Sequence, residues 1–298
     1  MMNIALFQMI VEKDIEDNFN KICKVIEYKL KKNTDIFVLP ETALTGYLGF
    51  SLERLEKLSS PKIFEYLNII SKLAEKKHIA IVIGQYMKRC GKWYNNLLFF
   101  GDDGKCLNSY DKSHLVDYDC FEVCAGNQPK VFEYKGVKMM LGICHDIRYP
   151  EHAMVGGDQG VQLLFNPFYG IRTSSDAEQV MKSYDSMIKT RSIENGIYII
   201  SPNISNNEQM VRSQICSPSG EIIVKATNFN EQLLYATIDP DLAGYGWVKK
   251  RRKDLYCFSN TVKEGSFFQN AYWQKDYYNS NHERLSLNID KVKRMEGI

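Results

Sequence analysis

Short apolar segments alternate with longer amphipathic stretches along the N-terminal part of the chain, and this alternation constrains the fold more than any other feature. The segments MNIALFQ, DIFVLPE and HIAIVIGQ have the length and the apolar content of buried strands. Between them, residues 14–31 and 61–77 have the spacing of apolar side chains that is typical of helices. An alternation of strands and helices predicts an α/β protein.

The middle and the C-terminal part of the chain add antiparallel strands. The segment YNNLLFFGDDGKCLNSYDK predicts two strands joined by an Asp-Asp-Gly turn, and RSQICSPSGEIIVKA predicts a second hairpin around Ser-Pro-Ser-Gly. Between these regions the alternation returns, with a helix that starts at Pro150 and another near 174–195. We therefore predict mixed sheets.

The chain has no linker rich in proline, glycine or serine, so we predict a single domain over residues 1–260. Residues 261–298 form a polar and aromatic tail without a clear period. Aromatic side chains interleaved with amides are suited to an interface. We expect the tail to pack on the domain or on a neighbouring subunit.

Composition and charge exclude several classes of protein. The net charge is +2 and the lysine clusters are short, which does not indicate nucleic-acid binding. The N-terminus lacks the basic region of a signal peptide, and no apolar run is long enough to cross a membrane. The eight cysteines are scattered, and no second pair accompanies Cys120 and Cys124, so we expect reduced thiols and no metal site. These features predict a cytoplasmic protein.

Cys144 is the most promising reactive side chain. It follows the apolar run VKMMLGI, and Pro150 can begin a helix shortly after it. The partial positive charge at a helix N-terminus favours the thiolate form of a nearby cysteine. The alternative is a buried structural thiol, which is the usual state of a free cysteine.

Two further charged residues follow predicted strands and could meet Cys144, because ligand sites of α/β sheets lie beyond the strand ends. Glu41 ends DIFVLPE and could accept the thiol proton, while Lys112 ends SYDK and, with the backbone N–H of His145, could stabilise a developing oxyanion. Such a reaction passes through a thioester, releases ammonia and needs no cofactor. Each residue alone could be structural, Glu41 as a turn cap and Lys112 as a solvated hairpin residue.

Three segments, FVLPETALTGY, YDKSHL and LGICHDIRYPE, resemble in this order the signature segments of the nitrilase superfamily of carbon–nitrogen hydrolases. The resemblance continues through LLFNPF, RSIENGIYIISPN, SPSGEII and RRKDLY. It implies a four-layer αββα sandwich of two mixed sheets with helices outside, and a homodimer or higher homo-oligomer. It also implies that Glu41, Lys112 and Cys144 form a catalytic triad.

The resemblance further implies a second carboxylate in the loop after the lysine. We assign it to Glu122, with Asp119 as the alternative because Asp119 stands at the more usual distance before Gly126. We expect the substrate pocket to be lined by a second group of residues, which comprises His145, Asn166, Phe168 and Tyr169.

For two of the residues that follow Cys144, namely His145 and Arg148, alternatives stay open. Adjacent side chains project in different directions, so we expect His145 to line the pocket rather than to act as the base, and a structural imidazole is equally compatible with the sequence. For Arg148 we expect a buried ion pair with Glu151 or Asp146, and binding of a substrate carboxylate is the alternative.

The predicted function is hydrolysis of a small linear amide or N-carbamoyl compound. An amide is preferred to a nitrile because this chain has Cys144-His145-Asp146 where true nitrilases more often have Cys-Trp-Glu. The alternatives are nitrile hydrolysis, acyl transfer to an amine by the same triad, and a non-enzymatic binding or assembly role.

Overall fold

The computed structural model describes residues 1–47, 52–116, 119, 123–127, 129–172, 176–244 and 246–251. Within them lie two six-stranded sheets. The order in the first is β12 (Gln232–Ile238), β1 (Met2–Gln8), β2 (Ile36–Val38), β3 (Ala80–Arg89), β4 (Lys92–Phe100) and β5 (Cys106–Asp111). The order in the second is β11 (Ile222–Lys225), β10 (Gln214–Cys216), β9 (Tyr198–Ser201), β8 (Leu163–Phe165), β7 (Val137–Leu141) and β6 (Phe132–Tyr134).

Both sheets are mixed, as the sequence predicts. In the first sheet β1, β2 and β3 are parallel, while β4, β5 and β12 pair antiparallel. In the second sheet β7, β8 and β9 are parallel, while β6, β10 and β11 pair antiparallel. Parallel strands therefore occupy the centre of each sheet, where both faces can be covered.

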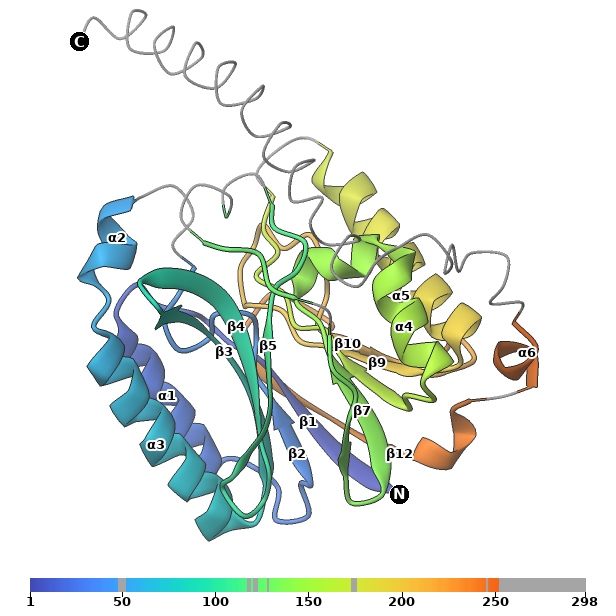
Figure 1. Cartoon of the computed structure of the whole chain (residues 1–298), viewed down its shortest axis with the longest axis horizontal. Helices are drawn as coiled ribbons and strands as arrows, with labels where there is room; N and C mark the ends of the chain where they lie inside the picture. Colours follow the sequence, from blue (N-terminus) through green and yellow to red (C-terminus); the bar gives the residue numbers. More distant parts are fainter. Residues whose placement is uncertain are drawn as a thin grey trace, which may run out of the picture. The chain divides into compact units, whose positions relative to one another are not determined.

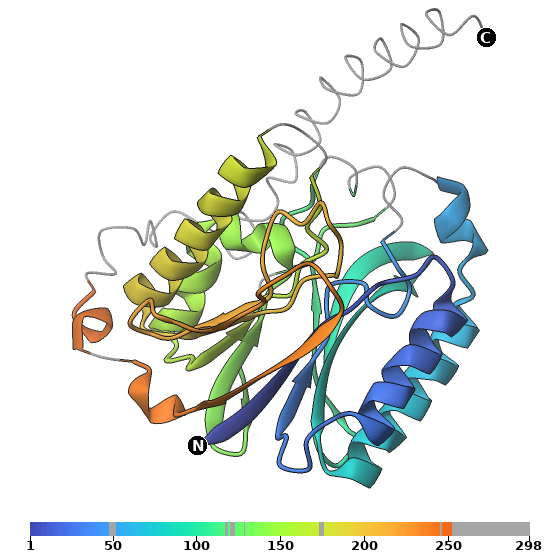
Figure 2. The same ribbon diagram turned by 180° about the vertical axis from the view of Figure 1, so that it is seen from behind.

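Helices cover the outer faces of the two sheets. Helices α1 (Ile15–Tyr28) and α3 (Ser60–Lys77) lie against the first sheet, and α4 (Pro150–Asp158) and α5 (Ala177–Asn195) lie against the second (Figure 1). Figure 2 shows the same four layers from behind. The described part also contains the short elements α2 (Leu52–Lys57), η2 (Cys144–Arg148), η3 (Pro240–Leu242) and α6 (Gly246–Lys249). The predicted αββα sandwich is confirmed.

Alternation along the central strands creates two apolar layers. Ile4 and Leu6 belong to the cluster that includes side chains from both sheets, whereas Ala5 and Phe7 belong to the cluster with α1 and α3. Successive side chains of a strand point to opposite faces of the sheet. The sequence of a strand that is covered on both faces is therefore one continuous apolar run. This is the physical basis of the segments from which the sequence predicts strands.

The helix ends follow local sequence signals. The side chain of Asp14 caps α1 by accepting hydrogen bonds from the N–H groups of Glu16 and Asp17, and Ser59 caps α3 through Lys62 N–H. Helix α4 begins at the predicted Pro150. Helix α5 ends where Gly196 adopts a left-handed conformation at φ 62°.

The chain divides into a unit of Met1–Lys250 and a second unit of Arg251–Ile298. The predicted tail, residues 261–298, lies outside the described residues, so its packing stays a prediction. None of the helices in the described part has both the length and the apolar character needed to cross a membrane. The homodimer and the cytoplasmic location also stay predictions.

Candidate active site

Glu41, Lys112 and Cys144 converge from three different strand ends. Glu41 follows β2, Lys112 directly follows β5 of the same sheet, and Cys144 begins η2 after β7 of the other sheet. The side chains of Glu41 and Lys112 are each 1% exposed, and Cys144 is 4% exposed. The site is therefore assembled across the two sheets and shielded from solvent.

Glu41 accepts hydrogen bonds from Lys112, Asn95 and the backbone of Tyr169. Its Oε1 atom accepts from Lys112 Nζ at 2.9 Å and from Asn95 Nδ2 at 2.8 Å, and its Oε2 atom accepts from the N–H of Tyr169 at 2.7 Å. Gly84 on β3 allows this packing, because a Cβ atom there would lie 2.5 Å from the backbone nitrogen of Thr42. The carboxylate is thus held in one orientation.

Asn95 is a contact that sequence reasoning missed. It lies within β4, in the run YNNLLFF, and is 1% exposed. The adjacent amides of Asn95 and Asn96, followed by four apolar residues in the same strand, were the available signal, since buried polar groups require partners. The partner, Glu41, is 54 residues away in sequence.

Lys112 lies between two carboxylates. Its Nζ atom is 2.9 Å from Glu41 Oε1 and 2.7 Å from Asp119 Oδ2. Burial alone would lower the pKa of Lys112, but the charges of Glu41 and Asp119 outweigh burial and raise this pKa well above its ordinary value. The lysine is consequently a permanent cation in the site.

Asp119 occupies the position against the lysine for which the sequence predicts a second carboxylate. It is 2% exposed, and its Oδ1 atom accepts a hydrogen bond of 2.8 Å from the hydroxyl of Tyr47. Glu122, the assigned residue, lies outside the described residues. Asp119, the alternative, is therefore the carboxylate that the described structure places on Lys112.

Cys144 lies in a sharp turn with a left-handed backbone, at φ 45°. Such a conformation is unusual for a residue with a side chain and is often found at functional sites. The turn is secured by two hydrogen bonds, from the N–H of Cys144 to the carbonyl of Pro167 at 2.8 Å and from Asn166 Nδ2 to the carbonyl of Cys144 at 3.3 Å. Asn166 thus holds the backbone of the turn.

The surroundings of Cys144 disfavour its thiolate form, which is consistent with a base that accepts the thiol proton. Burial raises the pKa of the thiol well above the ordinary value, the charge of Glu41 and a hydrogen bond to Glu41 raise it further, and Lys112 lowers it by less. The element that starts here is a five-residue 3₁₀ helix rather than a long helix. Burial and the charge of Glu41 have more effect on the pKa of the thiol than the charge of Lys112.

The other predicted pocket residues take different positions. Tyr169 is half-buried and stacks on Tyr47, with ring centroids 4.9 Å apart. Phe168 is completely buried and packs edge-on against Tyr184 at 5.7 Å. His145 is half-buried, and burial together with the charges of Lys112 and Arg148 lowers its pKa to about 4. The imidazole of His145 is therefore neutral at neutral pH.

Arg148 does not form the expected ion pair. Its Nε atom donates a hydrogen bond of 3.0 Å to the hydroxyl of Tyr184, and the guanidinium carbon lies 5.0 Å from the ring centroid. Within the described residues, no ion pair joins Arg148 to Glu151 or Asp146. The expectation is wrong because Asp146 is already surrounded by other donors and Tyr184 of α5 faces Arg148.

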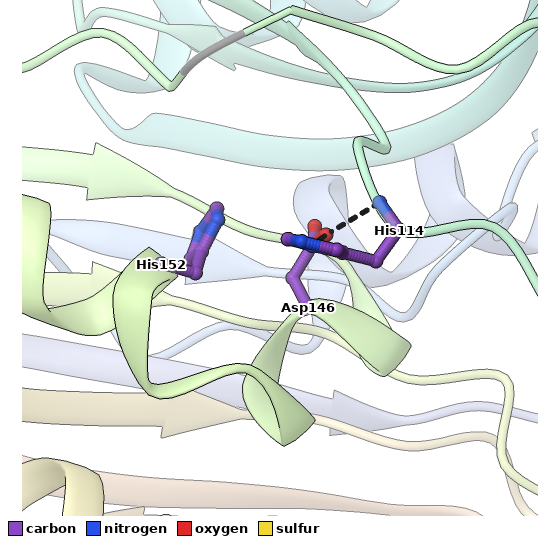
Figure 3. A group of neighbouring side chains, drawn as sticks. All are labelled: His114, Asp146 and His152. Carbon is purple, nitrogen blue, oxygen red and sulfur yellow. Dashed lines mark hydrogen bonds and ion pairs between the residues drawn. The ribbon is translucent and has the colours of Figure 1, made fainter. Parts of the chain in front are cut away.

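One group in the described part of the chain has the composition of a metal site. Ligand atoms of His114, Asp146 and His152 lie within 4.8 Å of one another (Figure 3). In the site of Cys144 itself, the close contact between the ammonium of Lys112 and both carboxylates leaves them paired with a cation already.

Comparisons with known proteins bear on the family and the fold of the chain. The family model described as carbon-nitrogen hydrolase matches residues 3–245. The omega-amidase NIT2-A of Xenopus laevis is 29% identical over 85% of this chain and 96% of the relative. The hydrolase in the agr operon of Staphylococcus lugdunensis is 30% identical over 78% of this chain and 96% of the relative. A solved amidase from Nesterenkonia sp. has the same fold, with a TM-score of 0.73 at 20% identity, over 86% of this chain and 95% of its own.

Proposed function

The chain belongs to the carbon–nitrogen hydrolase family, and from this premise we propose that it hydrolyses a small linear amide with Cys144 as the nucleophile. The burial of Lys112 between Glu41 and Asp119, beside the thiol of Cys144, carries the proposal. The relatives support an amide as substrate, because they include an omega-amidase, and an amidase of similar fold is known in complex with butyramide. An N-carbamoyl group contains the same carbonyl–nitrogen bond and stays within the proposed substrate class.

The first half of the reaction forms a thioester. Sγ of Cys144 attacks the carbonyl carbon while Glu41 accepts the thiol proton, and the electron pair of the carbonyl bond moves to oxygen. Lys112 and the backbone N–H of His145 stabilise that oxyanion. The oxyanion then collapses, the carbon–nitrogen bond breaks, and Glu41 returns its proton to the leaving nitrogen, which departs as ammonia.

The second half releases the acid. A water molecule attacks the thioester carbon while Glu41 accepts one of its protons. Collapse of this second intermediate breaks the carbon–sulfur bond, and the proton on Glu41 restores the thiol. The carboxylic acid leaves, and the enzyme is regenerated without a cofactor step.

Charge balance supports Glu41 as the base. A thiolate beside two ionised carboxylates would place three negative charges around the single positive charge of Lys112. Transfer of the thiol proton to Glu41 during the attack keeps the number of negative charges constant. The raised pKa of the Cys144 thiol supports this coupled transfer.

Ammonia release from a panel of compounds tests the proposal. The panel contains butyramide, ω-amides of dicarboxylic acids, N-carbamoyl compounds and nitriles. We expect turnover of amides, none in Cys144→Ala, and unchanged turnover in Cys216→Ala, which removes a second buried cysteine. Turnover of nitriles alone, or equal turnover in Cys144→Ala, would contradict the proposal, and transfer to an added amine would show an acyltransferase instead.

A further inference from the structure

Asp146 is a completely buried carboxylate, two residues after Cys144, that the proposed reaction does not use. Four donors surround it. Its Oδ2 atom accepts from the hydroxyl of Tyr110 at 2.8 Å and from the N–H of Ile143 at 2.9 Å. Its Oδ1 atom accepts from the backbone N–H of His114 at 3.0 Å and from His114 Nδ1 at 2.7 Å (Figure 3). All of the roughly four acceptor positions of a carboxylate are occupied.

These donors come from both parts of the active site. Ile143 immediately precedes Cys144 in the nucleophile turn, while Tyr110 and His114 lie two residues before and two residues after Lys112. The first segment follows β7, the second begins within β5 of the other sheet, and His114 and Asp146 are 32 residues apart in the chain. Asp146 therefore joins the backbone that carries the nucleophile to the backbone that carries the lysine.

We propose that Asp146 is a positioning residue that fixes the turn of Cys144 relative to Lys112. Displacement of a reacting group by about 1 Å can cost a reaction on the order of 10²-fold in rate, so a direct link between these segments has catalytic value. Two of the four hydrogen bonds are donated by backbone N–H groups, so they do not depend on the side chains of Ile143 and His114.

The lowered pKa of the Asp146 carboxyl group supports this role. Burial by itself would raise the pKa of Asp146, but the charges and hydrogen bonds of its neighbours, foremost His152 and His114, lower it to about 2. Asp146 consequently accepts hydrogen bonds throughout the neutral pH range. An amide of the same shape would present N–H groups to two of the four donors.

A metal ion held by His114, Asp146 and His152 is the competing interpretation. The distance of 2.7 Å between His114 Nδ1 and Asp146 Oδ1 is that of a charge-assisted hydrogen bond with the proton between the two atoms. A cation would have to displace this proton and compete with the other donors to the carboxylate. His152 packs edge-on against Tyr110 at 5.6 Å, and its burial lowers the pKa of the imidazole. The geometry favours the hydrogen-bonded link.

The test compares Asp146→Asn with Asp185→Asn. Asp185 lies on α5 and binds Gln214 and Lys225, so its replacement removes a carboxylate with two partners outside the site. For Asp146→Asn we expect kcat for an amide to fall on the order of 10²-fold with KM changed less than about threefold. We expect Asp185→Asn to keep both constants. Unchanged kcat in Asp146→Asn would overturn the proposal.

Amide hydrogen exchange tests the same link without turnover. Peptides that contain Ile143 or His114 should exchange about tenfold faster in Asp146→Asn, and at the wild-type rate in Asp185→Asn. Unchanged exchange in these peptides overturns the proposal. Because only the kinetic measurement rests on the proposed function, a wild-type protein without amidase activity would refute that function and leave the exchange test intact.

His114→Phe carries the test if Asp146→Asn does not fold. Phenylalanine can keep the stacking on Tyr149, where the ring centroids are 3.9 Å apart, but lacks the Nδ1 donor. We expect kcat to fall about tenfold, as for loss of one hydrogen bond to a charged group, with faster exchange at Ile143. Unchanged kcat and exchange would overturn the proposal, as would stoichiometric Zn²⁺ binding by the wild type that Asp146→Asn abolishes.

Discussion

Lys112 donates a hydrogen bond of 2.7 Å to Asp119, from a side chain that is only 1% exposed. The ammonium group of Lys112 therefore contacts a second carboxylate in addition to that of Glu41, which lies 2.9 Å away. A lysine shared between two carboxylates leaves one of them, Glu41, able to accept a proton while the other still neutralises the ammonium. Tyr47 holds Asp119 in place from the other side.

Replacement of Asp119 by Asn should affect activity more than replacement of Glu122 by Gln. Loss of the Asp119 charge breaks a buried ion pair, which is expected to cost about 3 kcal/mol of unfolding free energy and on the order of 10²-fold in kcat/KM. Steady-state ammonia release and chemical denaturation of both variants provide the measurement. A larger loss in Glu122→Gln would assign the second carboxylate to Glu122 instead.

Glu41→Gln should abolish turnover and at the same time make the thiol of Cys144 more acidic. Burial is the largest cause of the raised pKa of Cys144. The charge of Glu41 and its hydrogen bond to the thiol raise this pKa further, whereas Lys112 lowers it. Alkylation by iodoacetamide across a pH series, followed on the peptide that contains Cys144, should give a lower midpoint in the variant. The exposed Cys90 serves as the internal control. A midpoint at or above that of the wild type would refute this electrostatic explanation.

His145→Gln should make stability less sensitive to acid. The pKa of His145 is lowered from 6.5 to about 4, so the unfolded chain binds a proton between these values that the folded protein does not. The free energy of unfolding therefore falls as the pH drops from about 6.5 to about 4. Thermal unfolding at about pH 7 and about pH 5 should show a smaller decrease of Tm in the variant. An equal decrease in both proteins would contradict the prediction.

Asn95 should be required for the placement of Glu41. Asn95→Ser removes one hydrogen bond to a charged group and should lower kcat/KM about tenfold. Asn95→Asp should lower it further, because a second carboxylate would face Glu41. The matched control is Asn96→Ser on the same strand, whose side chain binds Asp111 and Ser109 rather than Glu41. If Asn96→Ser were as inactive as Asn95→Ser, general destabilisation of β4 would explain both.

The fold follows largely from patterns that are local in the sequence. Residues 61–77 and Pro150 mark helices that the structure confirms as α3 and α4 within one residue. The apolar runs around Ile36 and Ala80 become central parallel strands. These features can be predicted from the sequence because helix caps, turns and the alternation of side chains depend on neighbours within a few residues.

Sequence reasoning was weakest on charge and long-range contact. The ion pair predicted for Arg148 and the helix N-terminus considered for the acidity of Cys144 both rested on near neighbours in the sequence. In the structure, the pKa of Cys144 is set by burial and by Glu41, and Arg148 faces Tyr184, 36 residues away. Electrostatic effects grow where water is excluded, and burial is a property of the packed molecule.

The sequence by itself therefore determined the strands and helices of the sandwich, the order of its motifs, and that Glu41, Lys112 and Cys144 each follow a strand. Only the tertiary structure decided that Asp119 and Asn95 complete the contacts of this group, and that Asp146 ties its two halves together. The reason is that strand ends are encoded by short-range periodicity and turns. Hydrogen bonds between residues of separate strands and sheets exist only once the two sheets have packed and water has been removed from between them.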